Sequence, residues 1–300
     1  MGQLRRIPRQ DFESKRRHPL ANFFVRLVRE KLLGVVGGVI VLLLLVCGIF
    51  ADFLAPYPID EINILDRFAA PSLKHLLGAD QLGRDILSRL IHGARISLIV
   101  GLSATTISLF VAVTIGVPSG YFGGKLDMLM QRFVDAWISF PYILILLTIM
   151  SIVGRGILEI VLVIGVLAGI SWSRVVRSAV IDIKGNDYLV AANAIGNSPV
   201  RTVIRHIMPN IVAPLIVVFS VNIGAAIMAE ASLSFLGFGL PPDVPSWGGM
   251  LSGEGRRYME TKPVLALFPG TALVTVIYGV NMFGDAVRDL LDPRLRGVGQ

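Results

Sequence analysis

The feature that most constrains the fold is a series of long apolar runs, the first of which covers residues 32–51. This run contains twenty residues without a charged side chain, close to the ~20 that a helix needs to cross about 30 Å of hydrocarbon. Helices and closed barrels alone span bilayers, because every backbone polar group must be satisfied there. The run is too long for a signal-peptide core and no A-x-A site follows it, so we expect an uncleaved first helix.

Composition agrees with a polytopic membrane protein. Hydrophobic residues make up 54% of the 300 residues, charged residues only 16%, and mean hydropathy is +0.70, whereas soluble domains have about 25% charged residues. The net charge of +7 reflects Lys and Arg gathered in cytoplasmic segments, and no aromatic-interleaved basic patch indicates nucleic acid as a partner. The single cysteine, Cys47, excludes an intrachain disulfide, and four scattered histidines do not predict a metal site.

The apolar runs predict an all-α protein with six transmembrane helices. We expect Pro141 to kink the third span, and a separate short amphipathic helix near residues 83–91. The predicted parts are a basic cytoplasmic tail (1–31), the first transmembrane helix (32–53), an ordered external segment (54–93), a core of five helices (94–285) that includes a cytoplasmic loop (185–210), and a second cytoplasmic tail (286–300).

The distribution of Lys and Arg predicts the topology. With both termini in the cytoplasm, 19 of the 28 Lys and Arg residues fall in cytoplasmic segments. Positive charge is enriched on the cytoplasmic side of membrane proteins. We therefore expect residues 185–210, called the central loop below, to face the cytoplasm.

The central loop reads as two short helices. Asn186 or Asp187 can cap the first and Gly196-Asn197 can end it, and Ser198-Pro199 provides the cap and first residue of the second. Helical spacing places four residues on one face of the first helix: Tyr188, Ala191, Ala192 and Ile195. The small residues suit close approach by another protein, but an amphipathic helix lying on the membrane would have a similar pattern.

Four stretches resemble one family. Ala191-Ala192, Gly196 and the HIMP sequence of residues 206–209 resemble the EAA loop of ABC-importer permeases. Residues 75–98, 230–242 and 284–297 resemble the C-type permeases of dipeptide and oligopeptide importers. Together these stretches extend the resemblance to nearly the whole chain from residue 32 onward. One residue departs from the loop pattern: Val190 replaces an acidic residue, so a salt link made there is absent or moved to Asp187.

The resemblance implies a type I ABC-importer permease in the inner membrane of a prokaryotic cell. Such a subunit forms half of a translocation path together with a second homologous permease. Two cytoplasmic ABC ATPases hydrolyse ATP with Mg, and an external binding protein delivers the substrate. The implied residues for coupling to the ATPases are Asp187, Tyr188, Ala191, Ala192, Ile195, Gly196, Arg205, His206 and Pro209, with Arg205 and His206 holding the loop to the helix ends.

Polar residues within the spans are candidates for the translocation path, because such groups are costly in hydrocarbon. These are Asn222, Glu230 and Asn281, and hydrogen bonding between helices is the alternative for each. Asp135, near a helix end, is expected to have a structural or hinge role. The external stretches 80–89 and 241–249 are expected to face the binding protein or the partner permease.

Other functional classes lack their motifs. There is no HExxH or GxSxG, and Lys125 after two glycines is no phosphate loop, because Ser119 and Leu126 occupy its other key positions. This chain is therefore expected to bind no cofactor and to catalyse no reaction. An ion-driven carrier would show intramembrane carboxylates and inverted repeats, which are not evident, and a membrane scaffold would leave the polar residues unused. The resemblance implies an importer of peptides, and nickel complexes, glutathione and sugars are the alternative substrates.

Overall fold

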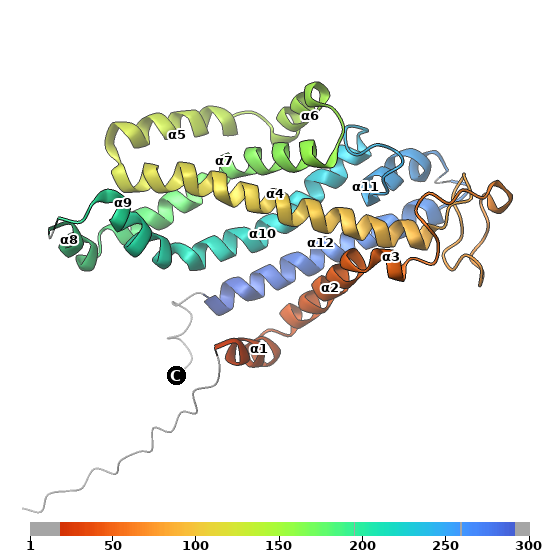
Figure 1. The fold of residues 1–300 in the computed structure, drawn as a ribbon, viewed down its shortest axis with the longest axis horizontal. Helices are drawn as coiled ribbons and strands as arrows, with labels where there is room; N and C mark the ends of the chain where they lie inside the picture. The colour runs from red at the N-terminus through yellow and green to blue at the C-terminus, as the bar shows by residue number, and fades with distance from the viewer. Residues whose placement is uncertain (1–18, 195, 259, 292–300) are drawn as a thin grey trace, which may run out of the picture.

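The computed structural model describes residues 19–194, 196–258 and 260–291, and these residues form helices without any β-strand (Figure 1). The α-helices are α1 (Pro19–Glu30), α2 (Leu32–Ile49), α3 (Ala51–Leu54), α4 (Ile86–Phe122), α5 (Gly124–Ile138), α6 (Tyr142–Val153), α7 (Ile157–Lys184), α8 (Asp187–Ala194), α9 (Pro199–Thr202), α10 (Met208–Phe235), α11 (Trp247–Met250) and α12 (Val264–Leu291). A 3₁₀ turn, η1 (Ile64–Asp66), and two π-helical turns, η2 (Val203–Ile207) and η3 (Leu251–Gly255), complete the set.

Five helical segments among the described residues are long and apolar enough to cross a membrane. They are α2, α4, α7, the continuous segment from α9 through α10, and α12; the bent pair α5–α6 makes a sixth. The long helices α4, α7, α10 and α12 run along a common axis, and α8 and the C-terminal end of α12 lie toward the end opposite the segment between α3 and α4 (Figure 1). The expected all-α architecture is confirmed, and the expected number of six spans agrees with it when the bent pair α5–α6 counts as one span.

Glycines bring α4 and α7 into close contact. A Cβ added to Gly169 of α7 would lie 2.6 Å from Cβ of Val111, and one added to Gly116 of α4 would lie 2.5 Å from the carbonyl oxygen of Ser173. Real Cβ atoms do not approach so closely, so the backbones meet where these residues lack side chains. The two helices thus form the tightly packed centre of the bundle.

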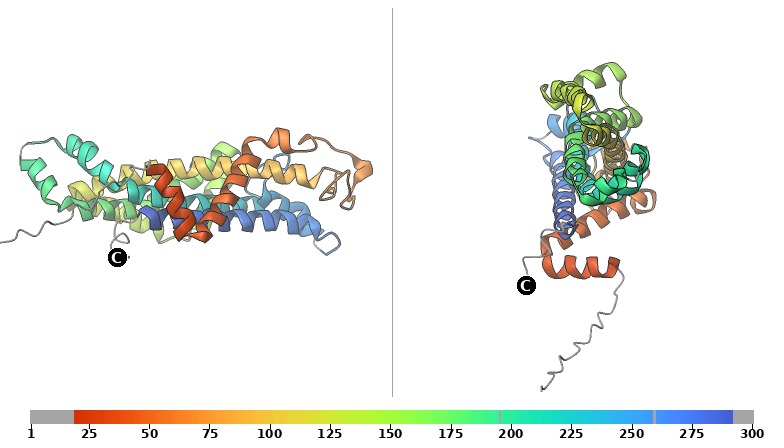
Figure 2. Two further views of the ribbon diagram at one scale, coloured as in Figure 1. Left: turned by 90° about the horizontal axis from the view of Figure 1, so that it is seen from below. Right: turned by 90° about the vertical axis from the view of Figure 1, so that its left-hand side faces the viewer.

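The helices on the other flank are packed in the same way. A Cβ on Gly37 of α2 would lie 2.5 Å from the carbonyl oxygen of Gly279 in α12. The helix α10 contacts α4, α7 and α12. Viewed along the long axis, α5 and α6 lie on one flank of the bundle and α1 and α2 on the opposite flank (Figure 2).

The helix α4 corrects two predicted boundaries. It runs without interruption from Ile86 to Phe122, so residues 83–91 are not a separate helix and the expected core boundary at residue 94 falls inside α4. Asp85 begins the helix by accepting a hydrogen bond from the Ser88 N–H. Hydropathy does not predict the N-terminus of α4, because a capped helix can extend beyond the hydrocarbon where its polar side chains form hydrogen bonds.

The third span is broken and not merely kinked. The axes of α5 and α6 meet at 85° across residues 139–141. Proline lacks an N–H and pushes the preceding residue out of the α region, and Pro141 itself has extended backbone with ψ 123°. Phe140 before it is 64% exposed, so the side chain at the break is not held by the core.

The predicted tails are also partly helical. Residues 19–30 form α1, whose Leu27 is buried against Ala286 and Leu290 of α12. Nζ of Lys31 lies 2.5 Å from Oδ2 of Asp289. The helix α12 extends to Leu291, so the expected boundary at residue 285 also falls inside a helix. Residues 1–18 and 292–300 of the predicted tails lie outside the described residues.

Candidate functional site

The central loop is attached to the bundle by buried aliphatic side chains. Leu189 of α8 is 2% exposed and belongs to one cluster with Val176 and Val180 of α7 and with Ile207 and Ile211. The other side of α8 is open, since Tyr188 is 43% exposed. The first helix of the loop therefore has an inner face that packs and an outer face that is accessible.

This arrangement differs from the predicted contact face. Ala192, expected to face an ATPase, is 5% exposed and lies on the inner side with Leu189, three residues before it in the helix. The apolar spacing of these two residues could have indicated the inner face. Asp187 is the first residue of α8 and is exposed, whereas Ile195 and the side chain of Ala191 lie outside the described part of the chain.

The predicted turn between the two loop helices is confirmed. Gly196 has φ +84°, with no atom within 4 Å of a Cβ placed on it, so its backbone conformation and not a lack of space favours glycine. The Ser198 hydroxyl accepts a hydrogen bond from the Arg201 N–H, and Pro199 is the first residue of α9. These features end α8 and start α9.

The turn η2 explains how a proline can follow α9 without stopping the chain's helical path. The Met208 N–H donates to the carbonyl oxygen of Val203, five residues earlier. In a regular helix the ring of Pro209 would clash with the carbonyl of Arg205, and a π-helical turn relieves such a clash. The loop thereby passes into α10 with its direction preserved.

The remaining coupling candidates lie on this turn. Arg205 is exposed and His206 is half-buried, and the Asn210 side-chain amide donates to the carbonyl oxygen of His206 at 2.6 Å. Within the described residues, the side chains of Arg205 and His206 form no hydrogen bond or ion pair. The predicted tethering by these two side chains therefore has no supporting contact in this chain alone.

Two ion pairs hold α5 along α7. The Arg177 guanidinium donates from Nε and Nη2 to the two carboxylate oxygens of Asp127, at 2.6 and 2.5 Å, and Arg174 pairs with Asp135. The Ser119 hydroxyl of α4 also donates to Asp127. The pair with Arg174 supports the structural role expected of Asp135. The pair between Asp127 and Arg177 was not predicted, because its members are fifty residues apart in sequence. The helix that leads into the central loop is thus tied to the broken span.

Two of the three residues expected to line a path are buried between or within helices. Asn222 is 2% exposed and accepts a hydrogen bond at 3.1 Å from the Trp172 indole N–H of α7. Glu230 is 0% exposed, and its Oε1 accepts from the Ser234 hydroxyl at 2.7 Å. Asn281 alone is exposed. In this conformation Asn222 and Glu230 take the alternative role of hydrogen bonding within the chain.

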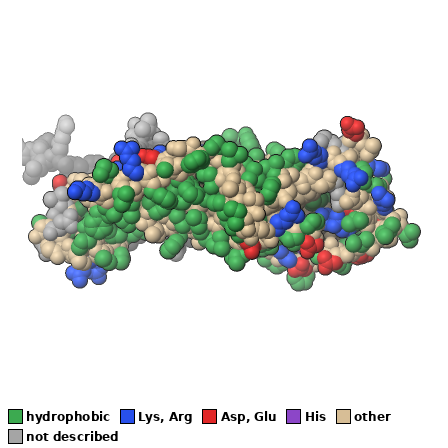
Figure 3. Space-filling model, turned by 90° about the horizontal axis from the view of Figure 1, so that it is seen from above, with side chains coloured by type: hydrophobic (Ala, Val, Ile, Leu, Met, Phe, Trp, Pro, Cys, Tyr) green, Lys and Arg blue, Asp and Glu red, His purple; other side chains and the backbone are tan. Residues whose placement is uncertain are grey.

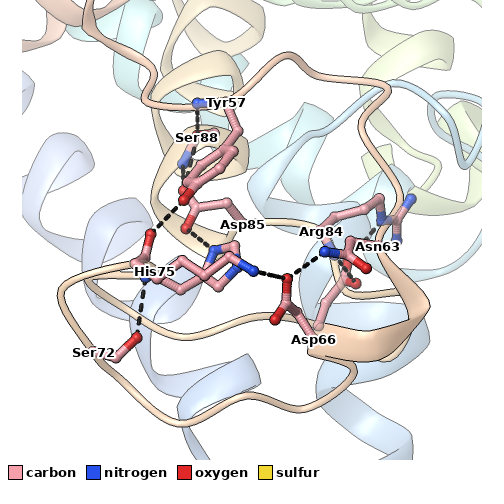
Figure 4. A network of polar contacts seen from close by, with 10 residues as sticks. Tyr57, Asn63, Asp66, Ser72, His75, Arg84, Asp85 and Ser88 are labelled. Carbon is pink, nitrogen blue, oxygen red and sulfur yellow. Dashed lines mark hydrogen bonds and ion pairs between the residues drawn. The ribbon is translucent and has the colours of Figure 1, made fainter.

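The segment between α3 and α4 is organised by a buried polar network (Figure 4). Nδ1 of His75 lies 3.0 Å from Oδ1 of Asp85, and its Nε2 lies 3.4 Å from Oδ2 of Asp66. The other Asp85 oxygen accepts from both the N–H and the hydroxyl of Ser88. A hydrogen bond from Lys74 lowers the pKa of Asp66. The network fixes this segment onto the start of α4.

The surface matches a membrane-embedded bundle. Figure 3 shows hydrophobic side chains over the middle of one face and charged side chains gathered toward its two ends. Large exposed side chains such as Phe110 (73%), Leu158 (65%) and Tyr278 (66%) lie on the long helices. Within the described residues, no group of three or more His, Cys, Asp or Glu side chains could hold a metal ion.

Comparisons with known proteins agree with this architecture. The family model for the binding-protein-dependent transport system inner membrane component matches residues 112–297, and that for the N-terminal transmembrane domain of oligopeptide transport permease C matches residues 18–71. The inward-facing MetNI methionine ABC transporter has a chain with the same fold, at TM-score 0.52 and 20% identity, covering 68% of this chain and 96% of that one.

Curated relatives match over nearly their whole length. The dipeptide transport system permease protein DppC of Alkalihalophilus pseudofirmus is 37% identical over 93% of this chain and 91% of its own. The glutathione transport system permease protein GsiD of Pectobacterium atrosepticum is 36% identical over 93% of both chains. The same-named protein of Escherichia coli O157:H7 is 36% identical over 91% of this chain and 90% of its own. This chain therefore belongs to the family of inner-membrane components of binding-protein-dependent transport systems.

Proposed function

We propose that this chain is a C-type permease subunit of an ATP-driven peptide importer, and that two cytoplasmic ABC ATPases act on its central loop. The observation that carries the coupling proposal is the two-faced helix α8. Leu189 anchors its inner face to α7 and the start of α10, while Tyr188 leaves the outer face open for a partner.

The anchoring suggests how ATPase movement would reach the membrane. A partner that displaces α8 also moves the inner ends of α7 and α10, because their side chains share one buried cluster. The ion pair between Asp127 and Arg177 extends this motion to α5. A cycle between two conformations requires partners that bind the two differently, and ATP with Mg on the partner subunits would supply that difference.

The other partners follow from the same proposal. A second homologous permease would complete the path, to which exposed Asn281 of α12 would contribute, and an external binding protein would deliver substrate. The chain would lie in the inner membrane, and the excess of Lys and Arg in the tails and central loop favours the cytoplasmic side for these parts. Dipeptide and glutathione permeases among the relatives favour a short peptide as substrate.

The decisive experiment is purification of the chain in detergent from its native membrane, with identification of the proteins that accompany it. We expect two ATPases with Walker motifs and a second multi-span permease. Tyr188→Ala should lower recovery of the ATPases, because it removes the exposed aromatic side chain of α8. Leu65→Ala, a matched control, removes a 95% exposed side chain from the segment at the opposite end of the bundle and should leave recovery unchanged.

Two results would contradict the proposal. Full recovery of the ATPases with Tyr188→Ala would show that the outer face of α8 does not bind them. A chain that purified alone and carried out transport in liposomes without ATP would instead favour an ion-driven carrier.

A further inference from the structure

A cavity of about 340 Å³ lies at the end of the bundle opposite the central loop, and three arginines line it. Arg89 comes from the first turns of α4, Arg155 from the turn between α6 and α7, and Arg257 from the stretch after η3. These three segments are far apart in sequence, so the convergence is a product of the fold and not of a local basic run.

Among the described side chains that line this cavity, all charged groups are positive. Arg89 is 6% exposed and its Nε lies 3.7 Å from Oδ2 of Asp80, a carboxylate that also binds Arg84 at 2.6 Å. Arg155 and Arg257 are exposed, and neither forms an ion pair within the described residues. Glu230 lies behind the wall, fully buried and bonded to Ser234, and is not among the lining residues.

The rest of the lining defines the shape of a ligand. Leu240, Pro241, Pro242 and Val244 form an apolar wall, and Ser246 and Ser252 add hydroxyl groups. A cavity of this size with apolar walls and a few charged groups is typical of a site for a small molecule or a protruding side chain. Guanidinium groups bind planar carboxylates through paired hydrogen bonds.

We infer that this cavity binds a carboxylate group, presented at the end of the bundle away from the central loop. The carboxylate comes from the terminus of a short peptide or from an acidic side chain of a docked protein, and both sources share the same chemistry. The apolar wall contacts the uncharged body of the ligand while Arg155 and Arg257 hold its charge. The inference stands on the cavity alone and does not depend on the ATPase contact.

The test measures charge preference inside the cavity with a Ser252→Cys variant of the full-length chain, purified with its accompanying subunits in phosphatidylcholine nanodiscs. The thiol is labelled with an anionic methanethiosulfonate bearing a sulfonate and with a cationic one bearing trimethylammonium. Labelling is followed by the mass of the peptide that contains position 252. Leu73→Cys, at a 99% exposed position in the segment before α4, is the matched control.

We expect the ratio of anionic to cationic labelling to be roughly tenfold higher at position 252 than at position 73, because a positive cleft concentrates anions. Adding Arg155→Gln and Arg257→Gln to the Ser252→Cys variant should bring the ratio to that of the control. Each ratio compares two reagents on one protein, so general damage to the fold affects both reagents alike. Equal ratios at the two positions would overturn the inference.

Protection experiments distinguish the sources of the carboxylate. The dipeptide Ala-Ala at millimolar concentration represents a peptide terminus, and N-acetylaspartic acid amide represents an acidic side chain. Slower labelling with either supports the inference and identifies the source. Equal protection by Ala-Ala and by its C-terminal amide would overturn the inference, because the amide lacks a carboxylate. Protection seen only when phosphatidylglycerol replaces phosphatidylcholine would also overturn it, because the ligand would then be a lipid phosphate. Uptake is not measured, so failure here leaves the importer proposal intact.

Discussion

The substitution Leu189→Ala should release α8 from the bundle while leaving the transmembrane core intact. Leu189 is 2% exposed, and its neighbours in the cluster, including Val180 and Ile207, are 0% exposed. The helix α8 has only eight residues, and isolated helices shorter than about 12 residues are marginal in water. Its order therefore depends on this packing.

The size of the effect follows from cavity formation. Replacing a buried leucine by alanine costs about 3 kcal/mol, toward the lower end of measured values. Every 1.4 kcal/mol changes an equilibrium constant tenfold, so the undocked population of α8 should rise about 100-fold. Leu189 takes no part in the glycine contacts that pack α4 against α7, so the cost falls on the loop and not on that packing.

Hydrogen exchange followed by mass spectrometry measures this change directly, since local opening governs the exchange of protected amides. We expect amides of α8 to exchange about 100-fold faster in Leu189→Ala, with unchanged rates in the middle of α4 and α7. Tyr188→Ala, one residue away but on the outer face, should alter these rates less than threefold. Equal rates in wild type and Leu189→Ala would refute the anchoring role, as would equal acceleration throughout the bundle.

Three further changes test other parts of the structure. Gly169→Ala should cost about 1–3 kcal/mol through overpacking and lower the thermal midpoint of the detergent-solubilised protein, whereas Gly38→Ala, with its nearest contact at 3.4 Å, should not; equal midpoints would contradict the close packing. Gly196→Val places a branched side chain at φ +84°, which costs about 1–2 kcal/mol, and should uncouple ATP hydrolysis from uptake; wild-type uptake per ATP would count against it. Asp127→Arg should also reduce coupling, and adding Arg177→Asp should restore part of it; a double variant no better than the single one would remove the ion pair from the mechanism.

Apolar runs predicted the positions of the spans well, but they predicted the ends of the helices poorly. Hydrocarbon selects apolar side chains, so a run such as residues 32–51 marks the membrane, and α2 covers residues 32–49 of it. The end of a helix depends instead on caps and on partners for polar side chains. The helix α4 begins at Ile86 because Asp85 caps it, and Arg95 remains helical while its guanidinium binds Asp52 of α3 at 2.8 Å. Those partners lie in segments that hydropathy does not connect.

Local sequence patterns predicted the turn in the central loop, but they did not predict contacts between distant segments. Ser198, Pro199 and Gly196 have the conformations that their residue types favour, so the turn was predictable. The apolar spacing of Leu189 and Ala192 indicates that they share a face of α8, but the contact of that face with α7 depends on how the bundle folds. Arg155 and Arg257 are likewise brought to one cavity only by the folded bundle.

The helix α4 physically connects the two ends of the molecule. Its 37 residues give a length of about 55 Å at 1.5 Å per residue, well beyond the ~30 Å of the hydrocarbon core. Its first turns carry Arg89 of the cavity, and its last turns carry Val117 of the cluster that anchors the central loop. Glycine contacts join α4 to α7 between Ala104 and Gly120, so this half of the pair resists bending. A shift imposed at the loop end would therefore move the joined parts of α4 and α7 together. The position of Arg89 relative to Arg155 and Arg257 would then change only if the turns that carry Arg155 and Arg257 change conformation.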